Sequence, residues 1–341
     1  MDFSSTPDYH GDTEMGLNGW LIGFSTFFYG LRLYVRIAMT KSPGLDDGIA
    51  GIAYVLLVFL SVMDIHAVTF GSGTHLNYIP QDILSKFFEA LAIQTLLYFW
   101  AVAMVRFAIL AFLPRLAQDR SIGLISWAVA AIILAQTITA FVYRLTECTV
   151  LADDFKALLS PGIHCVKLSA HNEMMIGHGV VGIAVDAILL LLPIWVICTR
   201  MMWSKKTLQI ILVLSVGVFA VATGIIRVVL ITTRDYYTDI TFEMPFLGIW
   251  TNVEGHVGLW CGCFPALQPL IRIASAKLKL LGLINSNGDA HEQLERNLTK
   301  TTCGGSGEYH NAMDGESQRA IVLTEMKSSE RAMRNRDTSP V

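Results

Sequence analysis

The sequence of residues Asp47–Phe70, DGIAGIAYVLLVFLSVMDIHAVTF, decides the fold class. It is long and apolar enough to cross the ~30 Å hydrocarbon core of a bilayer, which takes ~20 helical residues. A transmembrane β-barrel would instead show alternating segments of ~10 residues. Similar apolar runs recur, so we expect an all-α, seven-transmembrane helix bundle. The predicted spans lie near Gly16–Met39, Asp47–Phe70, Phe87–Leu113, Ile122–Leu145, Met174–Cys198, Leu208–Thr233 and Pro245–Ile271.

The composition of the 341-residue chain agrees with a membrane protein. Charged residues make up 16% of it and hydrophobic residues 53%, whereas a soluble domain averages ~25% charged residues. The net charge of −3 offers no basic patch for nucleic acid. The first fifteen residues lack the basic region of a cleavable signal peptide, so the first apolar helix is expected to stay as a signal-anchor.

The charge distribution predicts the orientation. One set of connections carries nine basic residues: Lys41, Arg115, Arg120, Arg200, Lys205, Lys206, Arg272, Lys277 and Lys279. The opposite set carries four: Lys86, Lys156, Lys167 and Arg234. The side richer in Lys and Arg is cytoplasmic. We therefore expect an extracellular N-terminal arm (1–15), a membrane domain (16–280) and a disordered cytoplasmic tail (281–341), in the plasma membrane or an endomembrane.

Ionisable residues within the predicted spans are the first candidates for function. They are Asp64, His66, Glu89, Arg106, His178, Asp186, Arg227, Glu254 and His256. A charge at the bilayer centre costs ~2.5–3.5 kcal/mol, so we expect these side chains to face the bundle interior or a wet cavity. Asp186 and Glu254 are the candidate partners of Arg227. The pattern indicates either a functional feature, which is a ligand pocket or a proton path, or a structural ion pair that orders the bundle.

Five of these residues are also weak catalytic candidates, because acids and histidines in a dry cavity can act as acid and base. They are Asp64, His66, Glu89, Glu254 and His256. No metal site is expected. Cys261 and Cys263 lie one residue apart, and such helix positions point to different faces.

Cys148 and Cys165 fall in the loop after the fourth span, on the predicted outer side. That compartment is oxidising, so a disulfide closing this loop is expected, with two free thiols as the alternative. Asn297 begins a glycosylation triplet but lies on the predicted cytoplasmic side.

A retinal-based pump needs a lysine in mid-bilayer to form a Schiff base. The seventh predicted span contains no lysine, and neither do the interiors of the others. The sequence therefore predicts a protein without retinal and without another cofactor.

Several motifs together resemble a known family. They include Leu31-Arg32 with Asp46-Asp47, Arg106–Arg115, Cys148 with Gly162–Cys165, Asp186 with Leu192–Ile194, Gly217 with Arg227, Trp250–Glu254 and Cys263–Pro269. In order and spacing the chain is similar to the fungal rhodopsin domain family of seven-helix proteins. Its relatives include orphan receptor-like proteins and proteins encoded in mycotoxin clusters such as that for satratoxin. The resemblance implies a multi-pass membrane protein, and a role in secondary metabolism by analogy.

Two functions follow as hypotheses. The first is a receptor-like sensor that binds a small lipophilic ligand outside and a signalling partner through its cytoplasmic loops and tail. The second is a membrane-embedded enzyme, such as a cyclase, or an accessory protein acting on a lipophilic metabolite.

Overall fold

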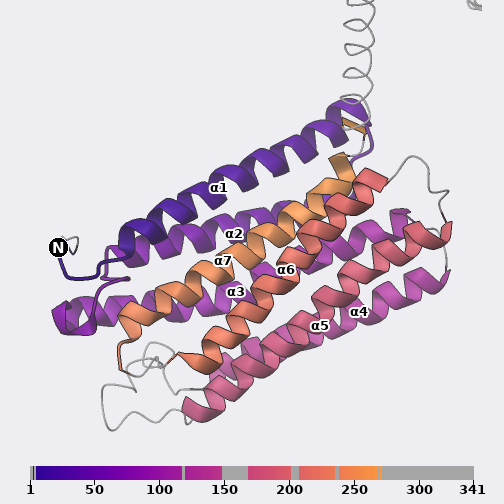
Figure 1. Cartoon of the computed structure of the whole chain (residues 1–341). Coiled ribbons are helices and arrows are strands. Elements are labelled where there is room, and N and C mark those ends of the chain that lie inside the picture. The colour runs from indigo at the N-terminus through magenta and orange to yellow at the C-terminus, as the bar shows by residue number, and fades with distance from the viewer. Residues whose placement is uncertain are drawn as a thin grey trace, which may run out of the picture. The chain divides into compact units, whose positions relative to one another are not determined.

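In a computed structural model, the described residues of the chain form seven long helices (Figure 1). The structure describes residues 3, 5–116, 120–147, 168–200, 207–234, 238–267 and 269–270. The helices are α1 (Gly11–Tyr34), α2 (Leu45–Val68), α3 (Gln81–Leu116), α4 (Arg120–Thr146), α5 (Leu168–Arg200), α6 (Thr207–Thr233) and α7 (Ile240–Cys263). Shorter turns are the π-helix η1 (Val35–Met39), η2 (Leu76–Tyr78) and η5 (Phe264–Leu267). No strand occurs among these residues, and the expected all-helical fold is confirmed.

Each helix packs beside its neighbours in chain order, and α7 closes the ring by packing against α1 (Figure 1). Helix α3 also touches α5 and α7, so it lies inside the bundle. Successive helices run in opposite directions, which gives the bundle two ends. We name them the Glu14 end, where α1, α3, α5 and α7 begin, and the Arg32 end, where these helices finish.

Four helical stretches are long and apolar enough to cross a bilayer: Leu45–Val68, Gln81–Leu113, Arg120–Thr146 and Ala170–Leu192. A shorter apolar stretch is Gly217–Thr233. Helices α1 and α7 are long enough to cross a bilayer but are less apolar, because polar residues interrupt them. These residues include Asn18, Arg32, Asn252 and Glu254. All four of these polar side chains are buried against other helices. The seven-helix bundle is thus confirmed, and spanning by α1, α6 and α7 stays a prediction.

The Glu14 end is tied together by backbone hydrogen bonds around a tight turn. Gly71 and Gly73 have φ of 95° and 81°, which favours glycine. Pro245 lies inside α7 and lacks an N–H, so the Thr241 carbonyl four residues earlier has no helical donor. The Gly73 N–H donates to that carbonyl at 3.0 Å, while the Gly73 carbonyl accepts from His10 N–H.

The Arg32 end is held by a buried arginine of α1. Its guanidinium donates to Asp47 Oδ1 and Asp46 Oδ2, both at 2.8 Å, and to the Gly262 carbonyl at 2.7 Å. The Arg32 side chain is fully buried. One side chain therefore joins α1 to the start of α2 and the end of α7.

Candidate functional site

Four charged residues form an ion network in the middle of the bundle. Arg106 of α3 donates two hydrogen bonds of 2.8 Å to the carboxylate of Asp186 on α5. The Nη2 atom of Arg106 also lies 3.7 Å from Glu254 Oε1 on α7. On the other side of Glu254, the Nε atom of Arg227 on α6 lies 2.8 Å from Oε2. We call this set the ion network.

The ion network pairs two arginines with two acids and is mostly buried. Relative exposure is 4% for Arg106, 2% for Arg227 and 5% for Glu254, whereas the Asp186 side chain is 17% exposed. The Arg227–Glu254 contact is close but lacks hydrogen-bond geometry. Arg227 also lies over the Tyr98 ring, 4.9 Å from its centroid. Its attraction to Glu254 is therefore mainly charge attraction, whereas Arg106 and Asp186 form a bidentate pair.

The structure places one of the two candidate partners beside Arg227. That partner is Glu254; Asp186 pairs with Arg106, a pair that the sequence did not indicate. Gly182, one turn before Asp186, makes room for it, because a Cβ there would lie 2.9 Å from Arg106 Nη2. The signal in the sequence was a glycine one turn from an acid.

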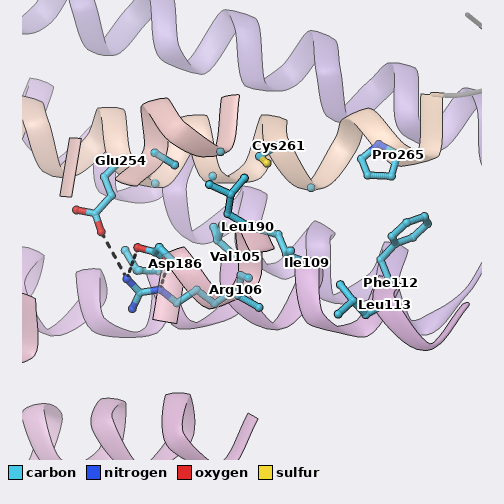
Figure 2. A pocket seen from close by; sticks show the side chains of 17 residues that line it. Val105, Arg106, Ile109, Phe112, Leu113, Asp186, Leu190, Glu254, Cys261 and Pro265 are labelled. Atoms are coloured by element: carbon cyan, nitrogen blue, oxygen red, sulfur yellow. Dashed lines mark hydrogen bonds and ion pairs between the residues drawn. The ribbon is translucent and has the colours of Figure 1, made fainter. Parts of the chain in front are cut away.

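One cavity lies between the ion network and the Arg32 end. It has a volume of about 70 Å³ and is lined by α3, α5, α6 and α7. Figure 2 shows Arg106, Asp186 and Glu254 at one end and Phe112, Leu113 and Pro265 at the other. Apart from that charged end, its wall is mainly apolar. We call it the Arg106 cavity.

A second cavity lies on the opposite side of the ion network, toward the Glu14 end. It has a volume of about 110 Å³, and we call it the Asp64 cavity. Its polar lining residues are Glu14, Asp64, Ser72, Gln94, Thr95, Tyr98, His171, Asn172, Arg227, Thr251 and Asn252. Apolar side chains such as Phe87, Leu91 and Met244 complete the wall.

The two cavities share the ion network as a common wall. Arg227 lines the Asp64 cavity, whereas Arg106, Asp186 and Glu254 line the Arg106 cavity. A change in the partner of Arg227 on one side would therefore alter the charge that Glu254 presents to the other side. That arrangement is able to couple the two halves of the bundle.

The weak catalytic candidates do not converge. Asp64 is buried in the Asp64 cavity and Glu254 is held in the ion network. His66 and Glu89 are exposed, so they do not face the bundle interior. His66 is two residues from Asp64 and thus on another face of α2. Glu89 lies near the beginning of α3, which starts at Gln81, six residues before the predicted span.

His256 is fully buried in a separate cluster. Its Nδ1 lies 2.6 Å from Ser25 Oγ and its Nε2 lies 2.9 Å from Ser61 Oγ. The Trp260 indole donates to the same Ser25 hydroxyl at 2.8 Å. Neither cavity is lined by His256. These contacts join α1, α2 and α7, which is a structural role.

A further polar cluster at the Glu14 end was not indicated by the sequence. Arg144 donates to Glu147 Oε2 at 2.6 Å, and His171 Nδ1 lies 2.8 Å from Glu147 Oε1. Burial alone would raise the pKa of Glu147, but the hydrogen bonds and charges of His171 and Arg144 outweigh it and lower that pKa. The cluster joins the end of α4 to the beginning of α5.

Some predicted sites lie outside the described residues, namely Cys148, Cys165, Asn297 and the tail 281–341. Within the part of the chain that the structure describes, Cys261 and Cys263 are reduced cysteines near the end of α7. In the same part, no three His, Cys, Asp or Glu side chains converge as metal ligands would.

The comparisons with known proteins give one match. The family model for the fungal rhodopsin domain matches residues 31–273, about 70% of the chain. The matched region begins at Leu31, beside Arg32, and extends past the end of α7. No curated protein and no solved structure matches the chain.

Proposed function

The chain belongs to the fungal rhodopsin domain family, and we propose that this membrane protein is a receptor-like sensor with its N-terminus outside. A small lipophilic molecule enters the Asp64 cavity at the Glu14 end. The cytoplasmic loops and tail then contact a signalling partner at the Arg32 end. The excess of Lys and Arg in the connections at the Arg32 end supports this orientation.

The ion network between the two cavities is the observation that carries this proposal. Arg227 faces the Asp64 cavity and is held mainly by Glu254, which Arg106 also attracts. A ligand that moves Arg227 changes the balance between these ion pairs. Since the four residues come from α3, α5, α6 and α7, such a change shifts helices that reach the Arg32 end. The coupling needs two states that the ligand distinguishes.

We propose that the protein works without retinal, despite the family name. Retinal attaches through a lysine, and neither cavity is lined by one. Helix α7 (Ile240–Cys263) contains no lysine in its sequence. The residues that line the cavities therefore do not fit a Schiff base.

A cavity-filling variant tests the sensing function. Gly248 lines the Asp64 cavity, and we expect Gly248→Leu to abolish a second-messenger response to extracts from the native environment. The matched control is Gly177→Leu on α5, where an added Cβ meets no atom within 4 Å. Both variants are first checked for delivery to the membrane. Sensing is excluded if wild-type cells and cells lacking the gene respond alike to every extract.

A membrane-embedded enzyme is the second candidate. It is supported by two carboxyl groups, Glu14 and Asp64, that line one cavity and are able to exchange protons with a substrate. Deleting the gene and profiling metabolites separates the candidates. An accumulated intermediate favours chemistry, and altered regulation of a whole pathway, as in secondary metabolism, favours sensing.

A further inference from the structure

Two buried carboxylates in the Asp64 cavity accept hydrogen bonds from neutral donors. Glu14 Oε2 accepts from the Ser72 hydroxyl at 2.8 Å. Asp64 Oδ1 accepts from Gln94 Nε2 at 2.7 Å, and Asp64 Oδ2 accepts from Asn252 Nδ2. Exposure is 2% for Glu14 and 6% for Asp64. The site is therefore well sealed but contains no compensating positive charge of its own.

The cations that line this cavity are already paired with other acids. Arg227 is beside Glu254 at 2.8 Å, and His171 is beside Glu147 at 2.8 Å. Across the described residues, no Lys, Arg or His side chain lies within ion-pair distance of Glu14 or Asp64. A buried carboxyl group without a cation either holds a proton or leaves a negative charge that a cationic ligand is able to neutralise.

An orphaned acceptor lies beside the two carboxylates. Asn252 is 1% exposed and lines the cavity, and its Oδ1 has no hydrogen-bond partner. The amide orientation is fixed, because Nδ2 donates to both Asn18 Oδ1 and Asp64 Oδ2. The unfilled positions around Glu14, Asp64 and Asn252 are therefore acceptors, which need donors.

An ammonium group matches this arrangement. It carries a positive charge and three N–H donors and has no acceptor. Phe87, Leu91 and Met244 supply an apolar wall for the carbon body of a ligand. The volume of about 110 Å³ suits a short alkyl or small-ring body, since an engineered cavity of about 150 Å³ takes up benzene.

We propose that the Asp64 cavity binds a small primary amine, whose ammonium group contacts Glu14, Asp64 and Asn252. This proposal rests on the sensing function, because it names the ligand of the same cavity more closely: a small molecule with a lipophilic body and an ammonium group. A carboxylate ligand would add a further negative charge beside two carboxyl groups that have no cation as a partner. An alcohol offers one donor and no charge, so it leaves acceptors unsatisfied.

The test measures binding to the full-length protein in lipid nanodiscs. The probes are n-butylamine, n-butanol and butyrate, with dissociation constants from isothermal titration or the shift in Tm. We expect n-butylamine to bind about tenfold or more tightly than n-butanol, and butyrate not to bind. This comparison uses the wild-type chain and needs no variant. Equal binding of amine and alcohol, or binding of butyrate, overturns the proposal.

Variants then locate the amine. We expect Glu14→Gln and Asp64→Asn each to weaken n-butylamine binding about tenfold, as loss of a charged hydrogen bond does. The matched controls are Glu243→Gln and Asp82→Asn, which lie outside the cavity lining and should leave binding unchanged. Unchanged binding in both cavity variants overturns the assignment. If amines do not bind but the cellular response is still lost in Gly248→Leu, the proposed ligand class is wrong and the sensing function stands. If amines bind but cells do not respond to any extract, the amine site stands and the sensing function is wrong.

Discussion

Two buried arginines, Arg106 and Arg227, differ in the geometry of their contacts with their acidic partners. Arg106 forms a two-bond contact with Asp186, whereas Arg227 shares Glu254 and lies over an aromatic ring. The sequence indicated that Arg227 needs an acid, because an unpaired charge is costly in lipid. Whether Asp186 or Glu254 pairs with Arg227 depends on how α5 and α7 are rotated about their axes. Side-chain packing decides that rotation, and packing is not visible in hydropathy.

Charge exchange tests this pairing. Arg227→Glu alone should lower delivery to the cell surface, because it buries two carboxylates side by side. The double variant Arg227→Glu with Glu254→Arg should restore much of the lost surface signal in flow cytometry. Exchange with the other acid, in Arg227→Glu with Asp186→Arg, is the control and should not. Rescue by that second combination instead would contradict the observed pairing.

The Glu147 cluster gives a pH dependence. The pKa of Glu147 is lowered in the folded protein by its partners His171 and Arg144, despite burial. Its contribution to stability is therefore present above the ordinary Glu pKa of ~4.3 and is lost as pH falls through the folded pKa. We expect wild-type Tm to fall more steeply than that of Glu147→Gln as the pH is lowered through this range. Parallel Tm curves for the two proteins would show that the cluster does not contribute.

Two of the helices begin well before the apolar runs that predicted them. Helix α3 begins at Gln81 and α5 at Leu168, six residues before each predicted span. Hydropathy detects the part of a helix in lipid, but helical hydrogen bonding continues into the polar region. The seventh predicted span begins at Pro245, yet α7 starts five residues earlier at Ile240. The freed carbonyl of Thr241 is satisfied by Gly73, a long-range contact that no local pattern shows.

The Gly73 turn gives a prediction at this scale. A Cβ at position 73 would lie 2.7 Å from Gly11 N, in a backbone conformation with φ of 81°. Gly73→Ala should therefore destabilise the protein by about 1–3 kcal/mol. The control is Gly16→Ala on α1, where a Cβ meets nothing within 4 Å, and which should stabilise the helix by up to about 1 kcal/mol. Thermal unfolding of both variants in detergent provides the measurement, and equal Tm values would argue against strain at Gly73.

The arrangement of all seven helices could be only partly predicted. The number of helices, their order and their class follow from length and hydropathy. The contact of α7 with α1, α2 and α3 does not, because it depends on which helix faces are small or polar. Gly255, Gly258 and Gly262 lie on the α7 side of those contacts, beside Leu57, Val105 and Ile109. The same contacts place the two cavities on either side of the ion network.

Orientation is testable on the whole molecule. An epitope tag after Val341 should be stained only in permeabilised cells, and a tag before Met1 should be stained in intact cells. Asn297 should carry no glycan, since glycosylation occurs on the luminal side. Staining of the Val341 tag in intact cells would reverse the proposed topology and place the Asp64 cavity on the cytoplasmic side.

The Arg32 contacts also constrain how the chain is made. The ribosome delivers α1 to the membrane first, but the Gly262 carbonyl that Arg32 contacts is delivered with the last helix. Until then, the guanidinium relies on Asp46 and Asp47 alone. A nascent chain that stops after α6 should therefore be recognised by quality control and degraded faster than the complete chain in a pulse-chase experiment. The hydrogen bonds of Arg32 in the first helix are therefore complete only after the seventh helix has been inserted.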